Sequence, residues 1–238
     1  MSGPHGDAAG ATETADRAAR APRTEAELLS RARAVAGHTV GDLGARLGVP
    51  IPEDQRRAKG LLGHLVERAL GATAGSRGVP DFEALGIELK TLPLRRDGRP
   101  MESTFVCCLP LRSVAEVDWE RSPVRAKLAR VLWVPVEAER YVPLASRRIG
   151  TPVLWSPTGT EGDILAADWE ELAGRVGAGD VEAITAHLGQ ALQVRPKGRH
   201  GRERRRAPDA GSAWLWTMPR GFYLRTWFTE AIVRRALA

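Results

Sequence analysis

The chain has 238 residues, of which 43% are hydrophobic and 27% charged, close to the averages of globular proteins. This composition excludes a fibrous or fully disordered chain, and no apolar run approaches the ~18–20 residues that cross a bilayer. The two cysteines, Cys107 and Cys108, are adjacent and poorly placed to bridge each other, since neighbouring strand residues point to opposite faces. We therefore expect a cytoplasmic protein that does not associate with membranes and folds without a disulfide or structural metal.

The charge is more informative than the composition. The chain carries 35 Lys and Arg against 29 Asp and Glu, a net charge of +6. Residues 195–206 contain seven cations and one acid, so the rest of the chain is balanced. A bland interpretation is a solvated basic loop, because runs of like charge repel one another. The alternative is contact with a polyanion, of which nucleic acid is the first to test.

In chain order, residues 1–23 lack apolar periodicity and are expected to be a disordered leader, with one folded domain over residues 24–238. Residues 24–27 (TEAE) read as a capping box that begins a helix, with the Thr24 hydroxyl and the Glu27 carboxylate as its two acceptors. Residues 39–42 repeat a similar signal. The prolines at 50 and 52 then end this helical pair.

A third helix is predicted from Lys59 to about residue 70, and Gly71 supplies its stop. The residues Lys59, Gly63 and Glu67 are four apart and share a polar face, with Gly60 beside them. Each glycine inside a helix costs ~1 kcal/mol relative to alanine. Two of them here indicate that another group comes close to this helix.

The centre of the chain alternates in the manner of strands. Residues 87–92 and 104–109 are predicted strands, joined through a turn at Asp97 and Gly98 into a meander. A short helix capped by Ser122 runs to about Arg130, and residues 131–136 form a buried strand. Helical spacing over residues 169–192, interrupted near Gly177 and Gly179, precedes a strand end at 193–195. This order favours an α/β or α+β fold with a mixed sheet flanked by helices.

The chemistry is concentrated in a D-x6-E-x-K pattern formed by Asp81, Glu88 and Lys90. Glu88 and Lys90 are two apart on a strand and share a face. Two carboxylates suit Mg2+, and a neighbouring lysine suits the orientation of a water and the neutralisation of charge on a phosphate. Glu67 is a candidate third carboxylate. The bland alternative is a solvent-facing Glu88–Lys90 pair.

Other features point away from further cofactors. The five histidines show no pairing with cysteine that is typical of a zinc site. No glycine-rich loop with Lys-Ser or Lys-Thr is present in the sequence, so we do not expect the chain to use ATP itself. The seven tryptophans are expected to lie in the core or to line a groove.

Several blocks of this sequence resemble the MutH family of mismatch-repair endonucleases, from about residue 24 to the end. The matching blocks are residues 59–67 (KGLLGHLVE), 70–76 (LGATAGS), 81–82 (DF), 84–91 (ALGIELKT), 102–107 (ESTFVC), 124–133 (VRAKLARVLW), 152–157 (PVLWSP), 192–197 (LQVRPK) and 219–224 (PRGFYL). The stretch from 199 to 206 is richer in arginine than is expected for this family.

The resemblance implies a restriction-endonuclease-like fold, monomeric, with two arms around a DNA-binding cleft. It further implies a Mg2+-dependent enzyme that nicks the unmethylated strand of double-stranded DNA at hemimethylated GATC sites, upstream of the G. Activation would come from the repair ATPase MutL, and from MutS through MutL. Any ATP dependence would therefore belong to a partner.

The resemblance also assigns residues. Those that match active-site positions are Asp81 and Glu88 as metal ligands, Leu89 as a carbonyl ligand, Lys90 beside the attacking water, and Glu67 and Lys127 as further active-site residues. Those that match DNA-contacting positions are Lys59, Gly60, Phe105, Arg195, Pro196, Lys197 and Tyr223. Among these, Tyr223 matches the residue that senses adenine methylation. From the residues alone, Phe105 and Tyr223 are equally compatible with places in the core.

Two alternatives remain open on the sequence. A Sau3AI-like restriction endonuclease shares the GATC preference and catalytic pattern but cuts both strands, and such enzymes resemble two copies of this domain. A DNA-binding or MutL-recruiting module without chemistry is the other alternative. The intact Asp81, Glu88 and Lys90 argue against the second.

Overall fold

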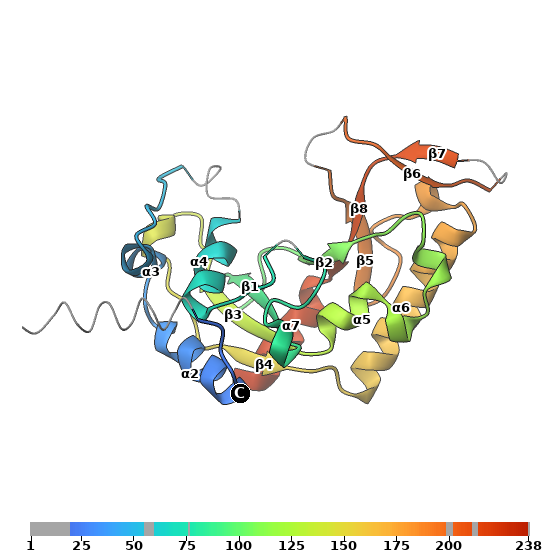
Figure 1. Cartoon of the computed structure of the whole chain (residues 1–238). Coiled ribbons are helices and arrows are strands. Elements are labelled where there is room, and N and C mark those ends of the chain that lie inside the picture. The colour runs from blue at the N-terminus through green and yellow to red at the C-terminus, as the bar shows by residue number, and fades with distance from the viewer. Residues whose placement is uncertain (1–19, 55–59, 76, 199–201, 211–213, 238) are drawn as a thin grey trace, which may run out of the picture. The chain divides into compact units, whose positions relative to one another are not determined.

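The computed structural model describes residues 20–54, 60–75, 77–198, 202–210 and 214–237. The chain divides into two compact units, each assembled from two stretches of sequence. Unit 1 comprises Met1–Asp97 and Leu132–Leu154, and unit 2 comprises Gly98–Val131 and Trp155–Ala238. Figure 1 labels their elements. The leader expected over residues 1–23 lies almost wholly outside the described residues. No helix in the described part of the chain is long and apolar enough to span a membrane.

Three helices of unit 1 surround its core. They are α2 (Glu25–Val35), α3 (Val40–Leu47) and α4 (Leu61–Leu70), with the short 3-10 helices η2 (Glu83–Leu85) and η5 (Leu144–Ser146). The capping box at the start of α3 is confirmed, because Thr39 Oγ1 accepts from the Asp42 amide and the Asp42 carboxylate accepts from the Thr39 amide. The sequence therefore identified this helix start with its correct chemistry.

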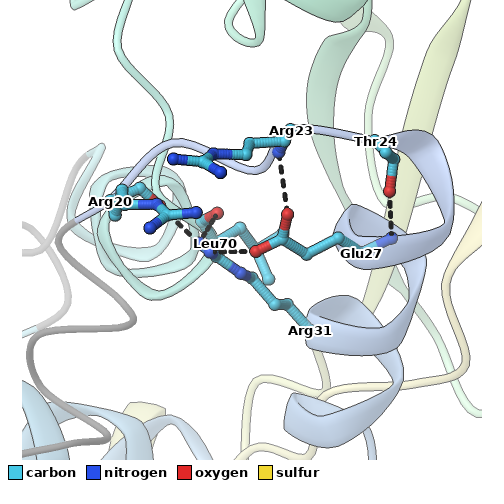
Figure 2. Close-up of polar contacts among 6 residues, drawn as sticks. All are labelled: Arg20, Arg23, Thr24, Glu27, Arg31 and Leu70. Atoms are coloured by element: carbon cyan, nitrogen blue, oxygen red, sulfur yellow. Dashed lines mark hydrogen bonds and ion pairs between the residues drawn. The ribbon is translucent and has the colours of Figure 1, made fainter.

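The box predicted at the start of α2 is only half present. Thr24 Oγ1 accepts from the Glu27 amide at 3.1 Å, but the Glu27 carboxylate accepts from the Arg23 amide and from Arg31 instead (Figure 2). The Arg23 amide and then the Arg31 guanidinium hold the pKa of Glu27 below its ordinary value. Arg31 also donates to the Leu70 carbonyl at 3.1 Å. Glu27 therefore does not cap α2. Its carboxylate binds Arg31, which in turn connects α2 to the end of α4.

The third helix, predicted from about Lys59 to Leu70, is confirmed to within two residues. Helix α4 begins at Leu61, and Gly60 caps it at φ 80°, a left-handed conformation that favours glycine. Lys59 lies outside the described residues. Of the two glycines only Gly63 is inside the helix, and a Cβ there meets only Glu67 Oε1, at 3.9 Å. Gly71 ends the helix as predicted, also at φ 80°.

Unit 1 contains a three-stranded sheet in the order β1-β3-β4, made of β1 (Glu88–Leu94), β3 (Val131–Glu137) and β4 (Val153–Trp155). Helix α4 packs against β1. The first six residues of β3 are buried, as the apolar run predicted. The core gathers side chains from all three helices and both longer strands, including Leu28, Leu43, Leu65, Leu89 and Leu132.

The expected meander is wrong. A turn does occur at Asp97 and Gly98, where Gly98 has φ 81°. However, β2 (Thr104–Cys108) pairs with β8 (Arg220–Leu224), whereas β1 neighbours β3. A turn signal shows that the chain reverses but carries no information on which strand edge accepts the next strand.

The sheet of unit 2 has the order β2-β8-β5, where β5 spans Leu192–Pro196 and pairs antiparallel with β8. A separate two-stranded ribbon joins β6 (Arg205–Pro208) to β7 (Trp214–Thr217). The other elements of the unit are α5 (Pro123–Leu128), α6 (Gly159–Gly177), α7 (Thr226–Leu237), η3 (Val114–Glu116), η4 (Trp119–Arg121) and η6 (Val181–Ala183). Ser122 caps α5 as predicted. The mixed α/β class is therefore confirmed.

The helical spacing predicted over residues 169–192 holds only up to its expected interruption near Gly177. Helix α6 begins ten residues earlier, at a capping box of Thr158 and Glu161, and ends at Gly177. Beyond it, the Asp168 side chain binds the chain as it enters β5. Its carboxylate accepts from the amides of Gln190, Ala191 and Leu192 at 2.6, 2.7 and 2.7 Å. A buried carboxylate thus fixes this segment where helical spacing alone predicted more helix.

Candidate active site

The D-x6-E-x-K spacing has a local structural cause. Phe82 and Ile87 exchange backbone hydrogen bonds of 2.9 and 3.3 Å around η2, and Gly86 closes the turn at φ 65°. The side chains of this antiparallel bridge are buried in the core of unit 1. The residues one step outside it, Asp81 and Glu88, are therefore opposed and have their side chains on the other face. Six intervening residues are what this tight reversal requires.

The Asp81 carboxylate is fixed by the strand beside it. Its Oδ2 accepts from the Leu89 amide at 2.8 Å, and its own carbonyl accepts from the Thr73 and Ala74 amides. In an extended strand the amide and carbonyl of one residue point to the same edge. The Leu89 carbonyl oxygen is thus directed toward the edge where Asp81 binds, consistent with the ligand role implied for it.

Glu88 and Lys90 share a face of β1, as predicted. Lys90 Nζ lies 2.6 Å from Glu88 Oε1. The Glu88 side chain is only 3% exposed and that of Lys90 14%. The bland alternative of a solvent-facing pair is therefore wrong. A carboxylate and an ammonium this far from water are costly to bury, a cost that functional sites commonly carry.

The donor set suits a hard divalent cation. Among the residues that the structure describes, no group of three or more His, Cys, Asp or Glu is placed to hold a metal. The structure therefore does not gather Glu67 with Asp81 and Glu88 into one cluster. Two carboxylates and a backbone carbonyl nevertheless fit Mg2+, which typically takes one or two carboxylates from a protein and keeps several waters.

The two further active-site candidates lie on helices. Glu67 is half-buried on α4, one turn after Gly63. Lys127 lies on α5 of unit 2 and is 9% exposed, an unusual degree of burial for lysine. The roles of both residues stay predictions.

Four of the predicted DNA-contacting residues come together on the sheet of unit 2. Phe105 on β2 faces Tyr223 on β8, with ring centroids 5.3 Å apart in an edge-to-face arrangement. The Lys197 ammonium lies 4.2 Å from the Phe105 ring centroid, and the Arg195 guanidinium 5.7 Å from that of Tyr223. Two aromatic rings and two cations thus form one surface, which we call the aromatic-cation cluster.

The cluster is accessible, and its members are held in place. Arg195 and Lys197 are exposed and Phe105 and Tyr223 half-buried, so neither aromatic residue is a core residue. Burial raises the pKa of the Tyr223 phenol above its ordinary value, against the opposing effect of Arg195. The hydroxyl is therefore protonated at neutral pH and available as a donor. Arg195 donates to Ser103 Oγ at 2.6 Å.

The remaining contact candidates are Pro196, which is exposed and pairs with Arg220 at the end of β5, and Gly60, the exposed cap of α4. Sequence reasoning missed Ser103, which positions Arg195, and Asp168, which fixes the entry to β5. Serine beside a strand gives no distinctive signal. Asp168 gave one, since an acidic residue among the apolar positions of α6 calls for buried partners.

Known proteins match this chain over most of its length. A family model described as "DNA mismatch repair enzyme MutH" matches residues 70–168. Curated relatives named "DNA mismatch repair protein MutH" from Enterobacter sp. (strain 638), Klebsiella pneumoniae (strain 342) and Salmonella newport (strain SL254) are each 50% identical over 214 residues. Each alignment covers 90% of this chain and 93% of the relative. Asp81, Glu88 and Lys90 lie within the range that the family model matches.

Proposed function

This chain belongs to the MutH family of DNA mismatch-repair enzymes, and from that premise we propose that it is a monomeric, Mg2+-dependent endonuclease of methyl-directed repair. Its substrate is duplex DNA with a hemimethylated GATC site, of which it nicks the unmethylated strand on the 5′ side of the G. MutL stimulates the reaction, and MutS acts through MutL.

The observation that carries this proposal is the arrangement of the buried Glu88 with the half-buried Asp81 and Lys90. The Phe82–Ile87 bridge opposes the two carboxylates, and Lys90 Nζ lies 2.6 Å from Glu88. A buried carboxylate paired with a lysine is costly to maintain, and functional sites commonly carry such a cost. Phosphodiester hydrolysis needs both carboxylate ligands and a cation next to the attacked phosphate.

Each residue has a separate task. Asp81, Glu88 and the Leu89 carbonyl would hold the divalent cation, which supplies Lewis-acid stabilisation of charge on the phosphate oxygens. Lys90 orients the attacking water through its ammonium hydrogens and neutralises negative charge that develops at the phosphorus. Its ion pair with Glu88 fixes the ammonium before substrate arrives, which lowers the cost of ordering it during the reaction.

The aromatic-cation cluster provides the means to read the site. Arginine pairs with the O6 and N7 atoms of guanine through two hydrogen bonds, and lysine neutralises phosphates. We assign the guanine contact to Arg195 and backbone contacts to Lys197. We assign methyl sensing to Tyr223, because its half-buried ring beside Phe105 can pack against the edge of a base and detect an added methyl group on adenine.

Replacing Tyr223 by serine is expected to reduce discrimination against methylated strands more than it reduces nicking itself. The smaller side chain opens space for the N6-methyl group, so fully methylated DNA becomes a better substrate relative to hemimethylated DNA. The measurement is the ratio of nicking rates on the two substrates. Tyr141→Ser is the matched control, since Tyr141 is the other tyrosine of the chain and is 74% exposed. An unchanged ratio in Tyr223→Ser rejects the sensor role.

The proposed function itself is tested with closed-circular plasmid that bears unmethylated, hemimethylated or fully methylated GATC sites. The plasmids are incubated with the protein and Mg2+, with and without MutL, and the ends are mapped. Nicks confined to unmethylated GATC strands and increased by MutL support the proposal. Double-strand breaks independent of MutL indicate a restriction enzyme instead, and binding without cleavage indicates a module that has no chemistry.

A further inference from the structure

The β6–β7 ribbon presents a second aromatic and cationic surface. One interpretation of the basic segment, residues 195–206, is a solvated loop. Its last two residues belong instead to strand β6, which begins at Arg205. In the ribbon register Arg206 opposes Trp216 and Pro208 opposes Trp214. Directly opposed residues point to the same face, as do residues two apart. These four side chains therefore share one face, which we call the ribbon face.

The opposite face of the ribbon packs against the rest of unit 2. Ala207 is fully buried and Thr217 is 3% exposed, and β6 contacts α6. Thr217 Oγ1 also donates to the Glu182 carboxylate. The ribbon is thus anchored through one side, and its tryptophans lie on the side that the protein does not cover.

The exposure of these tryptophans is unusual. Trp216 is 67% exposed and Trp214 45%, whereas Trp133, Trp155 and Trp169 are at most 4% exposed. Trp227 on α7 is also exposed, at 49%, but it is not part of the ribbon. Of the two positions expected for the tryptophans, the core is therefore excluded for Trp214 and Trp216. Large exposed apolar side chains that are gathered on one face indicate a binding surface.

The charges around the ribbon face indicate which kind of molecule it binds. The Trp214 ring has two guanidinium groups over it, Arg206 at 5.2 Å and Arg112 at 5.5 Å from its centroid. Arg202, Arg204 and Arg205 nearby are also exposed. The described residues 202–210 contain two acids, Glu203 and Asp209. The Glu203 carboxylate is paired with the Arg205 guanidinium at 2.9 Å. The surface is strongly positive, which complements a phosphate backbone rather than a neutral or basic protein.

The ribbon continues the strands that carry the aromatic-cation cluster. Pro219, which follows β7, accepts at its carbonyl from the Lys197 amide at 2.7 Å. Trp216 is three residues before Pro219, which is at most about 10 Å of extended chain. That distance corresponds to roughly three base pairs at about 3.4 Å each. The ribbon therefore begins close to Lys197, which is the predicted phosphate contact.

We propose that the ribbon face, made of Arg206, Pro208, Trp214 and Trp216 together with Arg112, binds duplex DNA that flanks the recognition site. The inference rests on the proposed function for the position of that site. Arg206 and Arg112 contact phosphates, and the indoles pack against deoxyribose, with their N–H groups as donors to phosphate oxygens. The contact is independent of sequence and extends the footprint beyond the four recognised base pairs.

The test compares Trp216→Ala and Arg206→Ala with wild type in metal-free buffer, so that binding is measured without cleavage. The affinity for a long duplex with a central GATC site, and for a short one that ends just outside it, is determined by fluorescence anisotropy over a range of salt concentrations. Both variants are expected to weaken binding of the long duplex several-fold and to leave the short one unchanged. Arg206→Ala is also expected to lower the salt dependence, as a slope of log affinity against log salt, by about 1.

The controls are Tyr141→Ala and Arg121→Ala, which remove an exposed aromatic ring and an exposed charge elsewhere. Equal affinities of variants and wild type for the long duplex overturn the inference, as does an equal loss on both duplexes or a loss confined to single-stranded DNA. Unchanged DNA binding with lost stimulation by MutL identifies a protein-docking surface instead. Nicking is measured in the separate plasmid assay with Mg2+. A wild-type protein that binds flanking DNA through the ribbon but does not nick in that assay contradicts the proposed function and leaves this inference standing.

Discussion

Replacing Lys90 by glutamine is expected to lower the rate of GATC nicking by about 100- to 1,000-fold, the effect of removing one charge-stabilising group from a preorganised site. DNA affinity is expected to stay close to wild type. Lys90 is paired with Glu88 at 2.6 Å, and glutamine keeps a donor for that carboxylate without the charge. Single-turnover nicking of a hemimethylated substrate is the measurement.

The control for Lys90→Gln is Arg95→Ala, which removes an exposed cation just beyond the end of the same strand. Alanine at position 90 is a less clear test, because the loss of a partner from a buried ion pair destabilises the fold. Thermal unfolding of each variant separates the two effects. A Lys90→Gln protein with wild-type melting temperature and wild-type nicking rate refutes the assignment.

Asp168→Asn is expected to have the largest effect on stability, a loss of about 2–4 kcal/mol in the free energy of unfolding. The substitution keeps the shape of the side chain but replaces one acceptor oxygen with an amide donor. Three backbone amides converge on this carboxylate, so at least one of them faces a donor. Denaturant unfolding is the measurement, with Asp163→Asn on the exposed side of the same helix as the control. The control is expected to change stability by less than about 0.5 kcal/mol.

Asp168 also connects stability with recognition. The segment that it binds leads directly into β5, which carries Arg195 and ends at Pro196. Asp168→Asn is therefore expected to weaken GATC binding at temperatures well below unfolding. A variant that loses stability but keeps wild-type affinity and specificity shows that β5 alone positions these side chains.

The sequence predicted best what depends on neighbouring residues. The capping box at Thr39, the stop at Gly71 and the shared face of Glu88 and Lys90 follow from contacts within a few positions. What failed depends on distant partners. The Asp97–Gly98 turn predicted a reversal but not the pairing of β2 with β8. The burial of Glu88 could not be inferred either, because alternation shows which residues share a face but not which face is covered.

The candidate site divides in the same way. The D-x6-E-x-K pattern was found from chemistry and spacing, whereas Phe105, Arg195 and Tyr223 were singled out through family resemblance. Their meeting on one sheet depends on pairings of β2 and β5 with β8 that no local pattern shows. The exposure of Trp214 and Trp216 could not be inferred either, because the solvated side of a two-stranded ribbon has no distinctive composition.

The loop that joins Asp81 to Glu88 has a consequence for how activity arises as the chain folds. Its ends are seven positions apart, so closing it costs little chain entropy. The aromatic-cation cluster instead needs strands separated by about a hundred residues to meet, a step of high contact order that is correspondingly slow. We therefore expect the local contacts around Asp81 and Glu88 to form earlier in folding than the aromatic-cation cluster. If the proposed roles hold, a partly folded molecule is expected to contain the carboxylate pair before it contains the surface that selects DNA, so selective cleavage would require complete folding of unit 2.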